Sequence, residues 1–341
     1  MRVLMICPEL PSEQNPGSMA PGARQIFSIR DAGIDVQIVD MRGIPKLKYL
    51  QVVPKVRQAI RNVDLVHAHF GYCGWLALLG RKLAMRRVPI VMSYMGDDLL
   101  GTPSDEKGNL EKSSIWAAKL NTRWAKRYEQ VIVKSREMAE KLSPTSCHVI
   151  PNGVNLSVFQ PEERAAARQR LGWSIAGEKV LFPGDPQNPR KGFQMAQAAV
   201  KLAESDWGRP LELVPLWGIK PDLVATYMNA CNAMLMTSLI EGSPNVVKEG
   251  LACDANVISV PVGDAHEMLT DVTNCHRVAR QPEAIATALC DVLRTNQASN
   301  GRAVLQQRRL SLEGVAQQVI EVYHQALAQV AVRKSPSTRQ A

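Results

Sequence analysis

Two carboxylates stand on either side of a small-residue turn in the stretch 237–253, which runs TSLIEGSPNVVKEGLAC. They are Glu241, inside the turn, and Glu249, eight residues later. An apolar run of strand length, NAMLM at 232–236, comes directly before them. From Asn245 onward apolar residues recur at helical spacing, and Asn245 is the expected N-cap. The stretch is therefore predicted to form a strand, a loop and the beginning of a helix.

A loop that leads into a helix favours phosphate, because the first N–H groups of a helix are unpaired and the helix dipole attracts negative charge. A carboxylate beside a phosphate is repelled by it, so the two glutamates are better suited to accept hydrogen bonds from sugar hydroxyl groups. Lys248 adds a positive charge nearby. A solvated loop before an ordinary amphipathic helix can carry the same two glutamates, so the pair alone decides nothing.

Glu–Gly, a loop with proline and a second glutamate after seven intervening residues together resemble the signature of the family-4 retaining glycosyltransferases. The sequence motif EGSPNVVKE at 241–249, followed by VGD at 262–264, is most similar to the branch of the family with teichuronic-acid and exopolysaccharide glycosyltransferases. Weaker similarity extends over about residues 1–330. The resemblance implies that this loop and helix hold a nucleoside-diphosphate sugar, with Glu241 on the sugar and Glu249 on the ribose. It also implies donor contacts by residues between them: Gly242, Ser243, Asn245, Val246 and Lys248.

A second phosphate-type loop, PGDPQNPRKGF at 183–193, follows another predicted strand and leads into a helix. Arg190 and Lys191 place two cations at the start of that helix, where a lone helix prefers anions, so an anion held between these cations and the helix amides is inferred. The resemblance implies an arginine and a lysine six residues apart here, together with a donor contact at Gly184. Lys191 fits this pattern, whereas Asp185 stands at the arginine position, so either Arg190 substitutes or the diphosphate has one contact fewer.

The length of 341 residues allows two domains of ordinary size, each with a core of its own. A hydrophobic content of 45% and a charged content of 21% are typical of a soluble globular protein. No run of about 18 apolar residues is present, so no transmembrane helix is expected, and the N-terminus MRVLMICPEL is predicted to be a buried strand rather than a signal peptide. Seven scattered cysteines without a C-x-x-C pair favour free thiols in a reducing cytoplasm over disulfides or a zinc site.

The net charge of +9 is concentrated in the N-terminal half, because residues 1–150 contain 22 Lys and Arg against 14 Asp and Glu, a net charge of +8. Within the helix predicted at 113–128, Trp116 and Trp124 accompany a basic stripe of Lys119, Arg123, Lys126 and Arg127, with Lys112 just before it. Such a face suits anionic lipid headgroups or a polyanionic acceptor, or it serves only to keep the protein soluble. No signature of a nucleic-acid-binding module occurs, so nucleic acid is not an expected partner.

Short apolar strands alternate with amphipathic helices in the N-terminal half, which predicts a parallel sheet covered on both faces. The predicted strands are 3–7, 36–39, 64–68, 89–94, 130–133 and 147–152, and the predicted helices are 23–32, 48–61, 74–85 and 113–128. Ligands bind beyond the carboxyl ends of such strands. The first loop there, 8–22, has no G-x-G-x-x-G fingerprint, which disfavours a nicotinamide enzyme. The resemblance makes Gly17 and Gly22 its candidate glycines for a donor or acceptor contact, with Gly17 assigned to the acceptor side.

Polar residues follow the third and fourth predicted strands. The third strand ends in HAHFG, where strand alternation directs His67 and His69 to one face. No third ligand stands at metal-binding spacing, so the pair is expected to face the ligand rather than a metal, and the resemblance favours His69 for an acceptor contact. Many relatives carry a histidine after the fourth strand, where Met95 stands here. Asp97 and Asp98 are therefore the nearest polar candidates for acceptor binding.

The second half repeats the pattern, with strands predicted at 179–182, 211–215, 232–236, 256–260 and 275–278 and a helix at 194–203. The run IPNGV-N-x-x-x-F-x-P resembles the family's crossing between domains and puts the boundary near Gln160. Trp217 lies where relatives seat the nucleotide base and either stacks on the base or packs, and Asn232 replaces the family's usual aspartate. An amphipathic helix at 311–332 is expected to cross back to the first domain, and the polar tail 333–341 is expected to be disordered.

Together these features predict the α/β architecture called GT-B, in which two facing doubly wound Rossmann-like domains hold the donor in the cleft between them. Residues 1–160 are the predicted acceptor-side domain and 161–310 the donor-binding domain. The predicted reaction transfers a hexose or derivative from a nucleoside-diphosphate sugar to a hydroxyl of a glycan or lipid-linked acceptor, with retention, in bacterial cell-surface polysaccharide synthesis. The predicted catalytic residues are Glu241, which orients the sugar, and Lys191 and Arg190, which stabilise the departing diphosphate.

No acidic D-x-D metal motif is evident, so the expected enzyme needs no metal and no cofactor beyond its nucleotide-sugar co-substrate. Its expected location is the cytoplasm, at the inner face of the plasma membrane. Two other functions fit the same features: a sugar-nucleotide epimerase on this fold, which would turn over the donor without an acceptor, and a non-catalytic nucleotide-sugar-binding protein. The nucleotide base, the sugar, the acceptor and the linkage stay open at this point.

Overall fold

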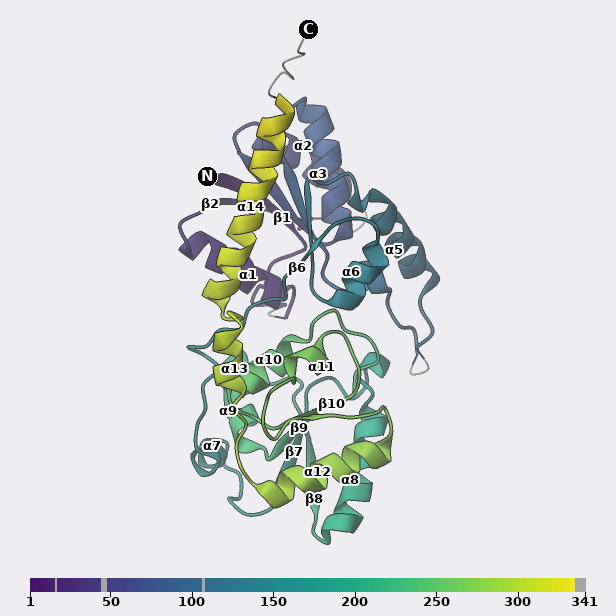
Figure 1. Ribbon diagram of the computed structural model, residues 1–341, viewed down its shortest axis with the longest axis vertical. Coiled ribbons are helices and arrows are strands. Elements are labelled where there is room, and N and C mark those ends of the chain that lie inside the picture. The colour runs from purple at the N-terminus through teal and green to yellow at the C-terminus, as the bar shows by residue number, and fades with distance from the viewer. Residues whose placement is uncertain (16, 44–47, 106–107, 335–341) are drawn as a thin grey trace. The chain divides into compact units, whose positions relative to one another are not determined.

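The computed structural model describes residues 1–15, 17–43, 48–105 and 108–334. The chain divides into two compact units (Figure 1). Unit 1 comprises Met1–Gly101, Lys112–Gly153 and the chain from Leu312 onward, and unit 2 comprises Thr102–Glu111 and Val154–Ser311. The main change from one unit to the other therefore falls after Gly153, seven residues before the boundary expected near Gln160.

Unit 1 is built on a six-stranded parallel sheet with the order β2-β1-β3-β4-β5-β6. Its strands are β1 (Arg2–Cys7), β2 (Asp35–Asp40), β3 (Leu65–His69), β4 (Ile90–Ser93), β5 (Gln130–Val133) and β6 (His148–Val149). In the central strands β3 and β4 every residue is buried. This is the near-continuous burial that a parallel sheet covered on both faces requires.

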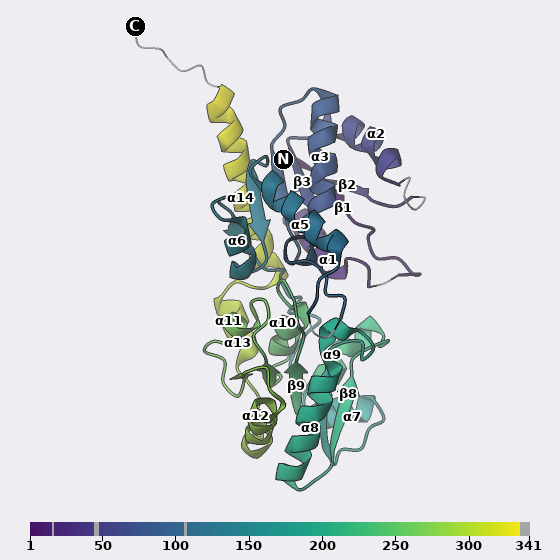
Figure 2. The same cartoon turned by 90° about the vertical axis from the view of Figure 1, so that its right-hand side faces the viewer.

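Helices cover both faces of this sheet. The first helix, α1 (Ala20–Asp31), packs against the C-terminal helix α14 (Leu312–Lys334), whereas α2 (Lys48–Ile60) packs against α3 (Gly71–Ala84). Figure 2 shows α14 and α3 on opposite sides of the strands. The other helices of unit 1 are α4 (Asp97–Leu100), α5 (Lys112–Ala125) and α6 (Arg136–Leu142).

Unit 2 is built on a five-stranded parallel sheet with the order β11-β10-β9-β7-β8. Its strands are β7 (Glu178–Phe182), β8 (Leu211–Pro215), β9 (Ala233–Met236), β10 (Val257–Ser259) and β11 (His276–Arg277). Its helices are α7 (Arg164–Arg170), α8 (Phe193–Trp207), α9 (Val224–Ala230), α10 (Asn245–Ala252), α11 (Ala265–Met268), α12 (Pro282–Thr295) and α13 (Gly301–Gln307), with 3-10 turns η1 (Pro189–Lys191) and η2 (Pro221–Leu223).

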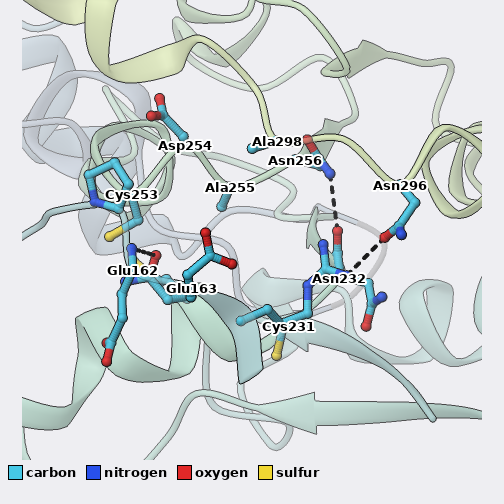
Figure 3. A pocket seen from close by; sticks show the side chains of 14 residues that line it. Glu162, Glu163, Cys231, Asn232, Cys253, Asp254, Ala255, Asn256, Asn296 and Ala298 are labelled. Carbon is cyan, nitrogen blue, oxygen red and sulfur yellow. Dashed lines mark hydrogen bonds between the residues drawn. The ribbon is translucent and has the colours of Figure 1, made fainter. Parts of the chain in front are cut away.

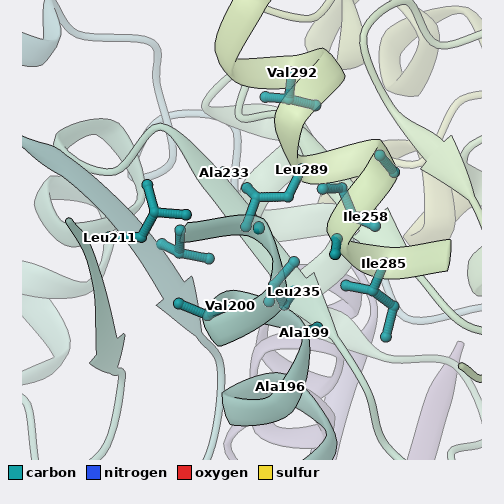
Figure 4. Packing of buried hydrophobic residues seen from close by; sticks show 14 of the residues in the cluster. Ala196, Ala199, Val200, Leu211, Ala233, Leu235, Ile258, Ile285, Leu289 and Val292 are labelled. Atoms are coloured by element: carbon teal, nitrogen blue, oxygen red, sulfur yellow. The ribbon is translucent and has the colours of Figure 1, made fainter. Parts of the chain in front are cut away.

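The core of unit 2 lies where α8 and α12 cover one face of the sheet (Figure 4). Helix α8 contributes alanines at 196, 199 and 203, and these small side chains let α12 approach closely. Helix α12 contributes Ile285, Leu289 and Val292, which recur at helical spacing, and the sheet contributes Leu235 and Ile258. This packing fixes β7 and β9 side by side, which matters because the loops after these two strands carry the predicted donor residues.

The strand order reverses at one point in each sheet: between β1 and β3 in unit 1 and between β7 and β9 in unit 2. Both sheets are therefore doubly wound, which confirms the predicted fold class of two Rossmann-like α/β domains. In such sheets ligands bind beyond the carboxyl ends of the strands at the reversal point. The topology thus directs attention to the loops after β1, β3, β7 and β9.

Each predicted strand corresponds to a strand of the structure, and β5 and β8 have the predicted bounds. Helix α5 ends at Ala125, so the prediction that it continues to Tyr128 is wrong and Lys126 and Arg127 lie in the turn that follows. The expected disorder of the tail concerns mainly residues 335–341, which lie outside the described residues, whereas Arg333 and Lys334 belong to α14. Among the described residues, no helix is long and apolar enough to cross a bilayer.

Candidate donor-binding and catalytic site

Two loops of unit 2 lie side by side at the reversal point of its sheet: the β7 loop (183–192) and the β9 loop (237–244). The backbone N–H of Leu239 donates to the carbonyl of Arg190 at 2.8 Å. The hydroxyl of Thr237 lies within hydrogen-bond distance of two carbonyls of the β7 loop, at residues 191 (3.0 Å) and 192 (3.1 Å). The chain thus joins the two predicted phosphate loops directly, although they lie about 50 residues apart in the sequence.

Gly192 makes this close approach possible. Its φ of +69° lies in the left-handed region, and a Cβ atom at this position would stand 2.4 Å from the carbonyl oxygen of Thr237. Gly192 ends the η1 turn and caps the start of α8. Only glycine therefore satisfies both the backbone angle and the contact with the β9 loop.

The three predicted catalytic side chains come together here. The ammonium of Lys191 donates to Glu241 Oε1 at 2.7 Å, and Arg190 Nη2 lies 3.7 Å from Glu241 Oε2. All three side chains are partly buried, so the charges are only partly screened by water. Gly184 lies under this group, because a Cβ there would stand 2.9 Å from Lys191 Cγ. One carboxylate between two cations leaves a net positive site at the carboxyl edge of the sheet.

The start of α10 stands at the end of the β9 loop. Helix α10 begins at Asn245 with Pro244 as its N-cap residue, so the prediction that Asn245 is the N-cap is wrong. Proline can occupy this position because the helix needs no N–H from it. The side-chain Oδ1 of Asn245 is buried without a hydrogen-bond partner among the described residues. Val246 and Glu249 are half-buried on the same helix, and the first backbone amides of a helix lack intrahelical partners.

Ser243 and Lys248 have side chains that bind each other. The ammonium of Lys248 donates to the hydroxyl oxygen of Ser243 at 2.7 Å, and that hydroxyl donates to Asp264 Oδ2 at 2.7 Å. Lys248 is 0% exposed and Asp264 is 2% exposed. Burial raises the pKa of the Asp264 carboxyl, while the charge of Lys248 and the Ser243 hydroxyl lower it. The sequence VGD at 262–264 carries part of the family resemblance, but no local pattern marks this role of Asp264.

Arg280 is a second residue that sequence analysis missed. It follows β11 and donates from Nη1 to the carbonyl of Thr237 at 3.0 Å and from Nη2 to the carbonyl of Ser238. Burial lowers the pKa of its guanidinium. Arg280 therefore holds the beginning of the β9 loop in place from the end of the edge strand β11. No local signal in the sequence marks it, because its partners lie more than 40 residues away.

In unit 1, His67 and His69 are both fully buried at the carboxyl end of β3. His67 bonds the Tyr323 hydroxyl through Nδ1 at 2.6 Å and the Ser93 hydroxyl through Nε2 at 2.7 Å. Neither ring nitrogen of His69 has a partner among the described residues. Burial lowers the pKa of both imidazoles, that of His69 to about 3, and Lys134 lowers both further. Both rings are therefore neutral at pH 7, and in the described part of the chain no three potential ligands gather around a metal position.

Asp98 is buried and stabilises a turn, so its carboxylate does not lie on an open surface. Its carboxylate accepts backbone N–H groups of Met95 and Gly96 at 3.0 Å and of Gly71 at 3.1 Å. Burial, the largest influence, raises its pKa to about 6 against the lowering effect of these three bonds. Asp97, the first residue of α4, is half-buried beside it. Gly17 stands exposed in the β1 loop with open space where a side chain would be.

Two family models match the chain. The model described as Glycosyltransferase Family 4 covers residues 2–158, and the model described as Glycosyl transferases group 1 covers residues 177–295. The chain belongs to the family-4 glycosyltransferases. This membership confirms the predicted family and does not favour an epimerase or a non-catalytic binding protein.

The glycosyltransferase is 24% identical to a teichuronic acid biosynthesis glycosyltransferase of Bacillus subtilis (strain 168), over 85% of its own length and 88% of the relative's. It is 26% identical to a D-inositol 3-phosphate glycosyltransferase of Mycolicibacterium gilvum, over 71% and 61%. Its fold is similar to that of a sucrose-phosphate synthase from Thermosynechococcus elongatus (TM-score 0.75, 18% identity, coverage 96% and 99%). It is also similar to Anabaena Alr3699/HepE in complex with UDP and glucose (TM-score 0.71, 17% identity, coverage 95% and 99%). At these identities the structures show the GT-B fold alone.

Asp185 and Met95, two of the positions that depart from the pattern implied by the resemblance, have local structural roles. Asp185 shapes the β7 loop, since its carboxylate accepts the N–H of Gln187 at 2.9 Å and its carbonyl accepts the N–H of Asn188 at 3.1 Å. Met95 is half-buried, and its N–H is one of the donors to Asp98. Trp217, after β8, is 63% exposed, so it does not pack in the core of unit 2.

A pocket of about 550 Å³ lies elsewhere in the glycosyltransferase, at the opposite edge of the unit 2 sheet (Figure 3). Asn232 and Asn256, which directly precede β9 and β10, lie on one side of it, and Glu162 and Cys253 lie on the other. The side-chain oxygen Oδ1 of Asn232 accepts from Arg168 Nη2 at 2.8 Å, so this amide has a structural role at the position where the resemblance implies an aspartate. The pocket is distinct from the β7 and β9 loops.

Proposed function

We propose that this glycosyltransferase moves a hexose or hexose derivative from a nucleoside-diphosphate sugar to a hydroxyl group of a glycan or lipid-linked acceptor, with retention at the anomeric carbon. The observation that carries the proposal is the group formed by Lys191, Arg190 and Glu241 at the reversal point of the unit 2 sheet, next to the start of α10. Cations and unpaired amides at one edge suit a diphosphate. The carboxylate between them suits sugar hydroxyl groups.

The chemistry follows from these charges. When the bond between the sugar and the diphosphate breaks, negative charge builds on the leaving oxygen. Lys191, Arg190 and the first amides of α10 would stabilise that charge, and fixed groups of this kind are the largest single contribution in many enzymes. Glu241 would orient the sugar and Glu249 would bind the ribose. Positioning rather than a protein nucleophile would then supply the remaining acceleration.

This mechanism calls for no metal and no resident cofactor, since the chain itself supplies the positive charge at the diphosphate. Of the proteins compared above, the structural neighbour HepE is in complex with UDP and glucose, and the Bacillus subtilis relative is named for teichuronic acid biosynthesis. We therefore propose a UDP-sugar as the first donor to test and a cell-surface polysaccharide as the product. Trp217 would stack on the base, and His69, Asp97 and Gly17 stay acceptor-side proposals. For Asp98 we propose support of the turn that presents Asp97.

We further propose that the protein works in the cytoplasm at an anionic membrane surface, which it contacts through α5. What supports this proposal is that Trp116 is 63% exposed on α5 beside Lys112, Lys119 and Arg123, which are also exposed. Trp116 packs edge-on against Trp75 of α3, with ring centres 6.5 Å apart. An exposed tryptophan within a basic stripe is typical of helices that lie in a bilayer interface.

The donor proposal is tested by thermal unfolding of the purified protein with UDP-, GDP- and ADP-sugars, because a ligand that binds only the folded state raises the unfolding temperature. We expect one nucleotide class to raise it, and Glu249→Ala to abolish that rise while the variant stays folded. The sugar must then appear on an added acceptor. No shift with any nucleotide, together with an intact cellular product in the Glu249→Ala strain, would overturn the proposal.

A further inference from the structure

A buried lysine needs a partner, because an ammonium without one costs several kcal/mol in the protein interior. Lys248 has 0% exposure and lies on α10, one turn before the helix ends. It donates to the Ser243 hydroxyl, which in turn donates to Asp264, each at 2.7 Å. An ammonium can only donate and a carboxylate can only accept, so the two hydrogen bonds have a fixed direction. We call these three residues the Lys–Ser–Asp relay.

The relay joins three segments that are separate in the sequence. Lys248 comes from α10, Ser243 from the β9 loop and Asp264 from the turn before α11. The same turn packs against the backbone of the β9 loop at Gly263, which has a φ of +52°. A Cβ at residue 263 would lie 2.8 Å from the carbonyl oxygen of Glu241 and 2.7 Å from that of Gly242. The relay therefore holds the turn against the backbone of Glu241.

Glu241 is thus fixed from two sides. Its carboxylate contacts Lys191 of the β7 loop at 2.7 Å, and its backbone contacts the turn that the relay holds in place. The ammonium of Lys248 is engaged inside the protein, where it is closed to solvent. This geometry disagrees with the expectation that Lys248 contacts the donor directly.

We propose that Lys248 and Asp264 are positioning residues, which act through Ser243 to hold Glu241 and the start of α10 in the geometry that the donor requires. The proposal rests on the proposed function for its effect on turnover. Its structural part, the ordering of the β9 loop, does not depend on which reaction the site performs. A displacement of about 1 Å at a reacting group lowers a rate by about 100-fold, so loss of the relay should appear in kcat.

A role in stability alone predicts a different outcome, and a double variant separates the two. Removing one charge leaves the other buried without its opposite charge in the relay, so Lys248→Met and Asp264→Asn should each lower the unfolding temperature strongly. The double variant Lys248→Met/Asp264→Asn removes both buried charges of the relay and should regain most of that loss. If the relay only stabilises the fold, activity should return with stability.

We expect the double variant to keep a kcat 10- to 100-fold below wild type, and its Kd for UDP to rise by a smaller factor, because the first amides of α10 also lose part of their positioning. Ser243→Ala, which leaves both charges, should lower kcat at least tenfold, and Ser243→Thr should restore part of it. The matched control is the partly buried pair of unit 1, Arg81 and Glu129, whose Nη1 and Oε2 atoms lie 2.8 Å apart. Arg81→Met/Glu129→Gln should alter the unfolding temperature and leave kcat within threefold.

Hydrogen–deuterium exchange measures how well the relay orders the β9 loop, and it needs no substrate. Amides of peptides spanning 237–249 should exchange at least fivefold faster in the double variant and in Ser243→Ala than in wild type, and the control pair should leave them unchanged. Unchanged exchange there, or a double variant with wild-type kcat, would overturn the relay. Wild-type protein that neither binds UDP nor consumes a UDP-sugar would instead overturn the proposed donor, while the exchange experiment still decides the relay.

Discussion

At the scale of single residues, Lys191 and Arg190 differ in their distance from Glu241. The ammonium of Lys191 is 2.7 Å from Glu241, whereas the guanidinium of Arg190 is 3.7 Å away. Removing one fixed donor to a leaving oxygen costs about 100- to 1,000-fold in kcat. We therefore expect Lys191→Met to lower kcat by that factor and Arg190→Met to lower it less. Initial rates of donor consumption measure both, with Lys201→Met on the exposed side of α8 as the control. A larger loss for Arg190→Met would assign the main role to arginine.

His69 gives a prediction about pH. Its pKa is about 3 in the folded protein, while a histidine in the unfolded chain titrates near 6.5. Between these values the unfolded state binds a proton that the folded state does not, so the contribution is complete above pH 6.5 and is lost as the pH falls. The loss for this residue rises toward about 1.4 kcal/mol per pH unit as the pH falls well below 6.5. Urea unfolding between pH 7 and 5 should show that extra slope in wild type relative to His69→Gln. Equal slopes would mean that the pKa of His69 is the same in the folded and the unfolded protein.

At the scale of elements, the two ends of α8 offer a matched pair of glycines. Gly192 and Gly208 cap the helix with φ of +69° and +70°, but only Gly192 would bring a Cβ against a neighbour, the carbonyl of Thr237. Alanine at either position strains the backbone by about 1 kcal/mol. We expect Gly208→Ala to cost only that strain and keep its kcat, whereas Gly192→Ala should also push the β7 and β9 loops apart and lower kcat at least tenfold. Thermal unfolding and donor turnover measure the two effects, and similar kcat values for both variants would contradict the loop contact.

The elements also show what the sequence alone could and could not predict. Strands such as β5 and β8 were found with their bounds because apolar runs between turn signals are local. Helix α12 was missed although Pro282 at its first turn and the spacing of Ile285, Leu289 and Val292 marked it. Those residues form a local amphipathic pattern that is sufficient to predict a helix.

Contacts between elements are a different case. The link between Lys248 and Asp264 passes through Ser243 and joins two turns that local patterns cannot pair. The same holds for Arg280, whose carbonyl partners lie after another strand. The family resemblance named Glu241 and Lys191 without any need for their distance, and the structure brings the two side chains together, while their catalytic role stays a prediction. What chemistry a residue type supports is local information, whereas the positioning of that residue depends on the fold.

At the scale of the whole molecule, part of the excess positive charge of the N-terminal half lies on α5. The basic residues exposed on α5 beside Trp116 are Lys112, Lys119 and Arg123. Each basic residue near an anionic bilayer contributes about 1 kcal/mol to binding. Replacing these three by glutamine should therefore weaken binding to vesicles that contain phosphatidylglycerol by about two orders of magnitude. Co-sedimentation with vesicles, compared with pure phosphatidylcholine, measures this difference.

The control for the α5 face replaces an equal charge elsewhere. Lys201, Arg209 and Lys220 of unit 2 are also exposed, and their replacement by glutamine lowers the net charge of the protein equally. If long-range attraction alone drew the protein to the membrane, both triple variants would lose the same affinity. A local docking face instead makes the α5 variant much the weaker one, and Trp116→Ala should weaken binding even at high salt, where screening removes the charge contribution but not the apolar contact. Equal losses in both triple variants would show that α5 is an ordinary solvated helix.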